Sequence, residues 1–173
     1  MEAMAMHGAA TRPGVRMLTT LGGVVLVAQG VAAAATEQNT KYAGSTGDVL
    51  SDGLLAGGLL LTLAGLEALR RVLSRRMAAL AMVGQVALLA SILATVAAGR
   101  EALDAVFVVG TLVWLVGLIG IAVAVARSRE RFWRAAIALP LAGLAALAFQ
   151  DAGGAALLGL VWIVLGARSA TQR

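Results

Sequence analysis

The sequence predicts an all-α integral membrane protein, and three features of the residue pattern indicate this fold class. Apolar residues make up 60% of the chain and charged residues only 13%, whereas a soluble domain is about half apolar and about a quarter charged. The apolar residues are gathered into long runs, and short charged clusters separate these runs. The basic residues are concentrated in every second connection, so nearly all of them lie on one side of the bundle that such runs would form. Because bilayer hydrocarbon solvates apolar side chains directly, these runs are stable as membrane helices.

Six apolar runs define a single transmembrane domain over residues 17–167, with polar cytoplasmic tails at 1–16 and 168–173. The runs cover residues 17–35, 49–69, 77–98, 104–126, 132–149 and 152–167. A spanning helix needs about 20 residues, with a range of about 17 to 25, and the first four runs meet this length. The run at 152–167 extends only about 24 Å at 1.5 Å per residue, so it barely approaches the thickness of the hydrocarbon.

The positions of the basic residues predict the orientation of the bundle. Of the 14 lysines and arginines, all except Lys41 and Arg100 fall on one side of the predicted bundle. The positive-inside rule places this side in the cytoplasm, with both termini. We therefore interpret the arginines as determinants of topology that contact anionic lipid head groups. No basic run is interleaved with stacking aromatic residues on a soluble domain, so we expect no nucleic-acid partner.

Two alternatives concern the ends of the chain. The basic start, the apolar run and the small residues Val31-Ala32-Ala33-Ala34-Ala35 are also typical of a signal peptide, which would be cleaved near residue 35. The segment 132–167 could form a re-entrant hairpin instead of spanning twice, since both arrangements return the C-terminus to the cytoplasm. The re-entrant form would bury Gln150 and Asp151 at its tip, which costs several kcal/mol unless they are paired or hydrated.

Glycines and one proline predict how the helices pack. Gly53 and Gly57 form a small-xxx-small pair that Gly58 and Gly65 continue, and Gly110, Gly117 and Gly120 mark the fourth run. Small residues let membrane helices approach closely, so we expect packing within the bundle, with a dimer face as the alternative. Pro140 is expected to bend the fifth helix, because it removes one backbone hydrogen bond.

Uncharged polar residues inside the runs are the first group of candidate site residues. They are Gln29, Thr62, Gln85 and Thr111. A buried amide needs hydrogen-bond partners in lipid, so Gln29 and Gln85 are the most informative of them. We expect these residues to hydrogen-bond between helices, and the alternative is that they line a polar cavity.

Carboxylates near the outer surface are the second group, and they comprise Asp48, Asp52, Asp104 and Asp151. All four are expected near helix N-termini, where the helix dipole stabilises a negative charge, and Ser51 or Asp48 is expected to cap the second helix. Their spacing matches no known coordination loop, so we predict no metal site. Apart from Asp104 and Arg134 at the ends of their runs, only Asp52 and Glu67 are ionisable within the runs, and Glu67 is placed to pair with Arg70 and Arg71.

The chain lacks the residues that most enzymatic and cofactor chemistry needs. It has no cysteine and one histidine, and the histidine, His7, lies in the polar tail. Nucleophile–base pairs, bis-histidine haem ligation and thiolate metal sites are therefore not expected inside the bundle. We predict no cofactor and no enzymatic activity.

The segment Tyr42-Ala43-Gly44-Ser45-Thr46-Gly47-Asp48, followed by Gly53-Leu54-Leu55 and the Arg70-Arg71 stop, resembles small multi-helix membrane proteins of unknown function of the actinobacterial type. The resemblance covers mainly the first loop and the second helix, and it implies a cell-membrane location without any site residues. We expect a non-enzymatic membrane component or accessory subunit, whose partners are the lipid bilayer and either further copies of itself or another membrane protein. The alternative is a small transporter or channel for a polar or cationic solute.

Overall fold

The computed structural model describes residues 13–35, 46–72, 75–98, 103–127, 131–150 and 152–168, with the backbone alone at 46–48, 72, 131–134 and 168. Four long helices come first: α1 (Pro13–Ala35), α2 (Thr46–Val72), α3 (Arg75–Ala98) and α4 (Asp104–Arg127). A 3₁₀ helix, η2 (Arg131–Ala138), leads into α5 (Leu139–Ala148), and α6 (Ala155–Arg168) follows. These residues contain no strand, so the expected all-α class is confirmed for the described part of the chain.

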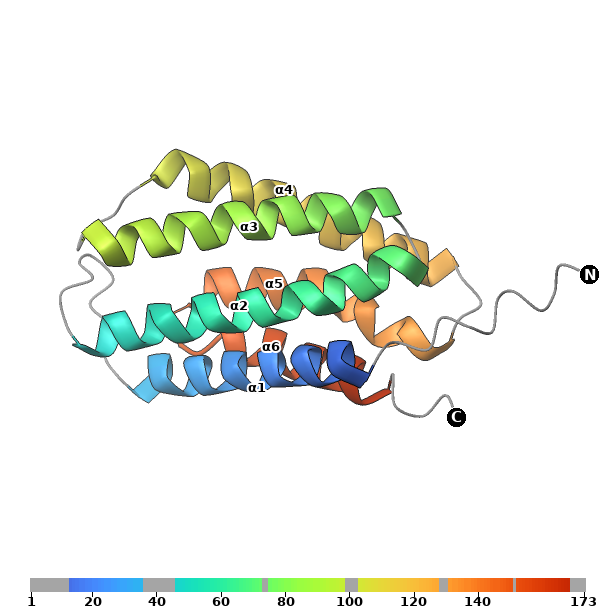
Figure 1. The fold of residues 1–173 in the computed structure, drawn as a ribbon, viewed down its shortest axis with the longest axis horizontal. Coiled ribbons are helices and arrows are strands. Elements are labelled where there is room, and N and C mark those ends of the chain that lie inside the picture. Colours follow the sequence, from blue (N-terminus) through green and yellow to red (C-terminus); the bar gives the residue numbers. More distant parts are fainter. Residues whose placement is uncertain are drawn as a thin grey trace, which may run out of the picture.

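The helices form a closed ring, in which each helix packs against the next and α6 packs against α1. Figure 1 shows neighbouring helices running in opposite directions, with the start of α1 and the end of α6 at the same end of the bundle. Short connections favour this antiparallel arrangement.

Large apolar side chains cover much of the outside of the bundle. Met17, Val83 and Leu141 are 72%, 64% and 71% exposed. A soluble monomer rarely exposes apolar surface on this scale, because water solvates it poorly. By length and composition, the helical stretches Pro13–Ala35, Val49–Arg71, Arg75–Ala98 and Asp104–Arg127 can each cross a membrane, and two further apolar helices, Ala135–Ala148 and Ala155–Ala167, are shorter.

Pro140 does not bend a long α-helix, as the sequence suggested, but lies in the first turn of α5. Proline has no N–H to donate and its ring collides with the carbonyl four residues earlier, so it favours the start of an α-helix. The residues before it form the 3₁₀ helix η2 instead, which rises about 2.0 Å per residue rather than 1.5 Å. The eight residues of η2 and the ten of α5 together extend about 31 Å along the chain axis.

Two tryptophans whose side chains the structure describes are buried, and both pack against glycines on neighbouring helices. Trp162 of α6 is 1% exposed, and a Cβ atom added to Gly65 of α2 would lie 2.6 Å from its ring. Trp114 of α4 is 2% exposed, and a Cβ atom added to Gly143 of α5 would lie 3.1 Å from its ring. The missing side chains thus provide the space in which the rings fit, and both tryptophans belong to the main core.

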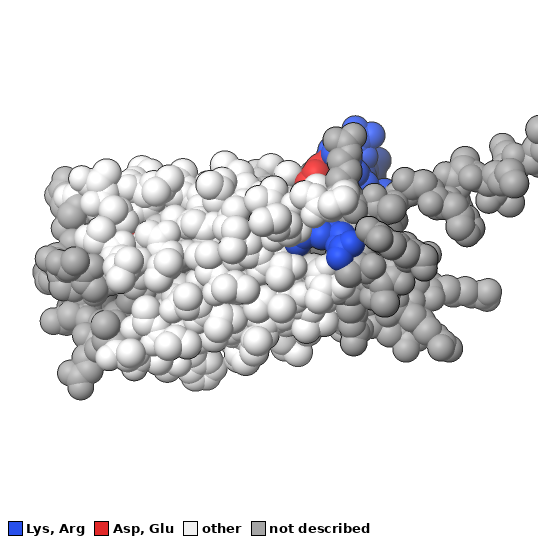
Figure 2. Space-filling model, turned by 60° about the horizontal axis from the view of Figure 1, so that its bottom comes forward, with Lys and Arg blue, Asp and Glu red and all other residues white. Residues whose placement is uncertain are grey.

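Charged side chains are sorted to the two ends of the bundle. One end, which we call the basic end, carries every arginine whose side chain is described: Arg16, Arg70, Arg71, Arg75, Arg76 and Arg127. Glu67 lies at this end too, whereas Asp52 and Asp104 are near the starts of α2 and α4, at the opposite end. Figure 2 shows the basic side chains gathered at one end of the bundle, beside a long uncharged surface.

Candidate functional site

A buried hydrogen-bonded cluster joins α2, α3 and α4, and the Gln85 side chain is its centre. Gln85 is 0% exposed. Its Nε2 donates to the Leu59 carbonyl oxygen at 2.5 Å and to the Thr62 hydroxyl at 2.9 Å, and both of these partners are on α2. Its Oε1 accepts a hydrogen bond from Trp114 Nε1 on α4 at 3.0 Å. One amide on α3 therefore bonds to both neighbouring helices.

The other polar side chains of the cluster are also hydrogen-bonded. Thr62 is 0% exposed, and its hydroxyl donates to the Leu59 carbonyl at 2.9 Å while it accepts from Gln85. The indole N–H of Trp114 is its only donor, and Gln85 accepts it. The cluster thus leaves no unpaired donor on Trp114 and no unpaired oxygen on Gln85. Such a satisfied polar network stabilises and specifies helix packing in an apolar interior.

Close approach of α3 and α4 makes the Trp114 bond possible. A Cβ atom on Gly84, next to Gln85, would collide with the backbone nitrogen of Trp114 and lie 2.6 Å from its Cα. One turn further on, a Cβ atom on Gly117 would lie 2.6 Å from the Cα of Ala81. Only glycine permits backbones this near to each other.

The predicted glycine contacts within the bundle are confirmed at most positions but not at Gly53. Gly58, Gly65, Gly110, Gly117 and Gly120 all face a neighbouring helix. Gly53 is exposed with nothing within 4 Å of an added Cβ atom, and Gly57 would meet only a Val25 methyl group at 4.0 Å. Gly53 therefore points away from the neighbouring helices, whereas Gly57 lies at the edge of the contact between α1 and α2.

Gln29 forms a second, smaller polar contact between α1 and α2. Its Nε2 donates to the Ser51 hydroxyl at 3.0 Å, and both residues are 2% exposed. Its Oε1 is buried and has no hydrogen-bond partner. Ser51 was expected as a helix cap, but α2 begins at Thr46, so Ser51 and Asp48 both lie inside the helix and Ser51 serves as a partner of Gln29.

Thr111 does not join either contact. It lies on α4, three residues before Trp114, and its hydroxyl oxygen is buried without a partner. Of the predicted polar residues, the structure therefore joins Gln85 and Thr62 directly, places Gln29 in a separate pair and leaves Thr111 unbonded.

The predicted outer carboxylates are only partly covered by the described residues. Asp104 is exposed in the first turn of α4, and Asp52 is partly exposed near the start of α2. Asp48 lies in the helical backbone of α2 with its side chain outside the description, and Asp151 lies outside the described residues. No group of three or more His, Cys, Asp or Glu side chains that could hold a metal ion occurs among the described residues.

The ion pair predicted at the end of α2 is confirmed. Glu67 accepts hydrogen bonds from Arg70 Nε at 2.5 Å and Nη2 at 2.8 Å, and from Arg71 Nε at 2.9 Å. The Arg70 and Arg71 side chains are 33% and 61% exposed. This carboxylate therefore neutralises part of the basic end.

Sequence reasoning missed Trp114 and Arg16 as polar members of the bundle and gave Ser51 a different role, that of a helix cap. The Nε of Arg16, near the start of α1, is buried and has no hydrogen-bond partner. A helical periodicity count gives a signal for Trp114, since it lies three and four residues from Gly110, Thr111, Gly117 and Leu118 on one face of α4.

None of the protein-family models, curated proteins and solved structures compared with this chain matches it.

Proposed function

We propose that all six helical segments cross the cell membrane, with both chain ends on the cytoplasmic side. The positive-inside rule supports this orientation, because the described arginine side chains all lie at the basic end. The packing of α6 along α1 supports the last two crossings. Gly166 contacts Thr20 near the start of α1, and Gly153 contacts Gly30 near its end. The turn before α6 thus lies beside the last turns of α1, in the half of the bundle opposite the basic end, whereas a re-entrant hairpin would turn back near the middle.

Cysteine labelling tests this topology cleanly, because the chain has no cysteine of its own. Gln150 lies in the turn between α5 and α6, and Arg75 lies at the basic end, and both are exposed. We expect Gln150→Cys to react with a membrane-impermeant maleimide in intact cells. Arg75→Cys should react only after the membrane is opened. Labelling of both variants only in opened cells would favour the re-entrant hairpin.

Within this topology, we propose a non-enzymatic role as a membrane component or accessory subunit. The Gln85 cluster is the observation that carries the proposal. Its donors and acceptors are hydrogen-bonded to one another across three helices. They therefore hold the helices together and are not available to bind a solute. A rigid, glycine-packed bundle with an apolar exterior is suited to binding other membrane helices.

Purification of the tagged protein from its native membrane in mild detergent tests the role. We expect a second membrane protein in a fixed ratio, identified by mass spectrometry, with a particle mass that accounts for both chains. A particle that contains this chain alone, as monomer or homo-oligomer, would count against an accessory role.

A transporter or channel for a small polar or cationic solute is the second candidate. The buried oxygen atoms of Gln29 and Thr111 favour it, because both are unpaired and could line a polar path. Flux into liposomes that contain the purified chain distinguishes the two. Flux that falls when Gln29 and Gln85 are replaced by leucine would support transport, and absence of flux in the wild-type protein would exclude it for the solutes tested.

A further inference from the structure

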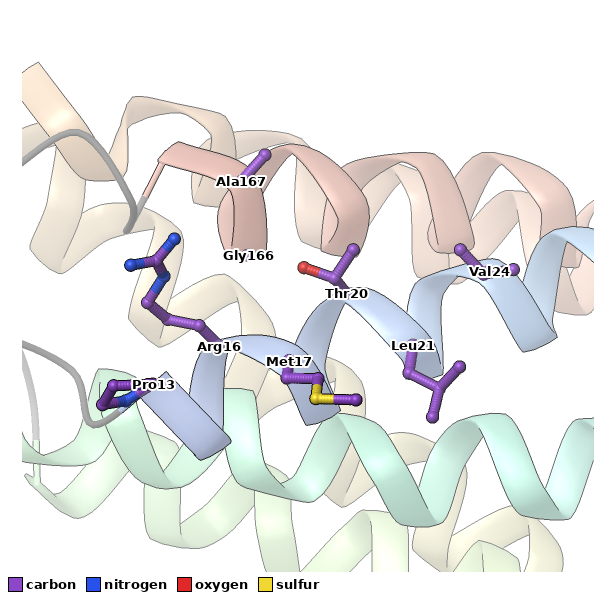
Figure 3. Close-up of a pocket in the computed structure, with 8 residues that line it drawn as sticks. All are labelled: Pro13, Arg16, Met17, Thr20, Leu21, Val24, Gly166 and Ala167. Carbon is purple, nitrogen blue, oxygen red and sulfur yellow. The ribbon is translucent and has the colours of Figure 1, made fainter.

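A groove between the first turns of α1 and the last turn of α6 opens at the basic end of the bundle. Its volume is about 490 Å³. Figure 3 shows Arg16 at the mouth of the groove, Thr20 between the two helices, and Met17, Leu21 and Val24 following along α1. The floor is Gly166, where an added Cβ atom would collide with the Thr20 hydroxyl. The two helices thus touch at the floor and leave the groove open above it.

The mouth of the groove carries a positive charge without a described counter-ion. Arg16 is half-buried, and its Nε has no hydrogen-bond acceptor. Glu67, the acidic side chain described at this end, is bonded to Arg70 and Arg71. The guanidinium end of Arg16 lies at this mouth, and hydrogen bonds to a charged donor are strong, so an anion would be stabilised there.

The walls of the groove are apolar over a length that suits an acyl chain. Met17, Leu21 and Val24 lie on one face of α1 and are 72%, 44% and 48% exposed. From Arg16 to Val24 the helix rises about 12 Å at 1.5 Å per residue. One leaflet of the hydrocarbon core is about 15 Å deep. The groove therefore starts at the head-group level and follows the chains toward the middle of the bilayer.

We propose that this groove binds an anionic phospholipid of the cytoplasmic leaflet, with its phosphate on Arg16 and one acyl chain along Met17, Leu21 and Val24. A guanidinium group matches phosphate oxygens with two parallel hydrogen bonds, and the Thr20 hydroxyl can donate to the same head group. Basic pockets between helices on the cytoplasmic side are suited to acidic lipid head groups. The charge at the mouth selects an anionic lipid over a zwitterionic one, and the apolar walls select a lipid over free phosphate. This inference rests on the proposed membrane orientation and not on the proposed role as a subunit.

Native mass spectrometry of the full chain in detergent, titrated with phosphatidylglycerol or phosphatidylcholine, tests the proposal. We expect the first phosphatidylglycerol to bind at least tenfold more tightly than phosphatidylcholine. Arg16→Gln should abolish this preference, whereas Arg75→Gln, which removes an exposed charge at the same end, should change it less than twofold. Equal losses in the two variants would overturn the site, since they would indicate only the general attraction of a basic surface.

Two further variants, together with competition by phosphate, test what binds in the groove and whether the protein is still folded. Ala167→Phe fills the groove from its exposed rim without changing the charge, and it should weaken phosphatidylglycerol binding as Arg16→Gln does. Arg16→Lys keeps the charge but loses the paired hydrogen bonds, so intermediate affinity is expected if the fold is intact. Displacement of the lipid by millimolar inorganic phosphate, or a change of oligomer mass on Ala167→Phe, would contradict a lipid site and indicate a free anion or a second copy of the chain. Lipid binding and co-purification of a second membrane protein are measured separately. A negative result for one therefore leaves the other proposal testable.

Discussion

Two buried amides, Gln85 and Gln29, lie in the same apolar bundle and differ in how completely they are hydrogen-bonded. The Gln85 amide uses its nitrogen and its oxygen and bonds to α2 and α4. The Gln29 amide uses only its nitrogen, on Ser51, and its oxygen is unpaired. The residues are chemically identical, so the difference arises from what the neighbouring helices present to each of them.

The neighbours of Gln85 are close because glycine removes the side chains between α3 and α4. Gly84 brings the Trp114 backbone near, and the indole N–H then reaches the Gln85 oxygen. Gln29 has no comparable donor beside it, since Gly153 in the turn before α6, and Ala156 and Gly159 of α6, pack against α1 with backbone and methyl groups. A polar residue therefore stabilises this bundle only where close packing also delivers a matching polar partner.

The largest expected effect comes from Gly84→Ala, which would break the Gln85 cluster by separating α3 from α4. The added Cβ atom would lie 2.6 Å from the Trp114 Cα and 2.7 Å from the Gly110 carbonyl oxygen, and backbone atoms cannot move aside cheaply. We expect a loss of about 2–4 kcal/mol in the free energy of unfolding, at or above the usual range for overpacking. Reversible unfolding in mixed micelles measures it. Gly53→Ala, in open space, is the matched control and should cost nothing.

Gln85→Met comes next, because it keeps the volume of the side chain but removes its hydrogen bonds. It leaves the Trp114 N–H buried without an acceptor, so we expect a loss of about 1–2 kcal/mol in the same unfolding measurement. A variant as stable as the wild type would mean that the cluster contributes nothing to helix packing.

Gln29→Met should have a much smaller effect, within about 0.5 kcal/mol of the wild type. It removes one hydrogen bond, but it also removes an oxygen that is buried without a partner, and the two changes oppose each other. The Ser51 hydroxyl can still bond to a carbonyl of its own helix. A loss as large as that of Gln85→Met would show that the Gln29 oxygen has a partner, such as a bound water or solute.

A similarly small effect is expected for Glu67→Gln, which tests a polar contact outside the core. The arginines that Glu67 pairs with are partly or well exposed, and exposed ion pairs contribute about 0.2–1 kcal/mol. The loss should shrink further when the salt concentration is raised. A salt-independent loss above this range would mean that the pair is shielded from solvent.

The sequence predicted the helical segments and the distribution of charge, because both depend on composition along the chain. The long apolar runs and the Glu67 pair with Arg70 and Arg71 follow from local spacing, and both are confirmed. Contacts between helices were harder to predict. Gly53 carries the same small-xxx-small signal as the glycines that do pack, but the rotation of α2 turns it outward. The partners of Gln85 depend on the depth and rotation of three helices, which no local pattern encodes.

The central claim is that the Gln85 cluster holds the helices together, and a double-mutant cycle between Gln85 and Trp114 tests it most directly. Unfolding free energies would be measured for Gln85→Met, Trp114→Phe and the double variant of the full chain. We predict a coupling energy of about 1 kcal/mol, because each single change leaves the other partner unpaired and the double change leaves neither. Additive single effects, with no coupling, would contradict the account and leave Gln85 free for a role other than helix packing.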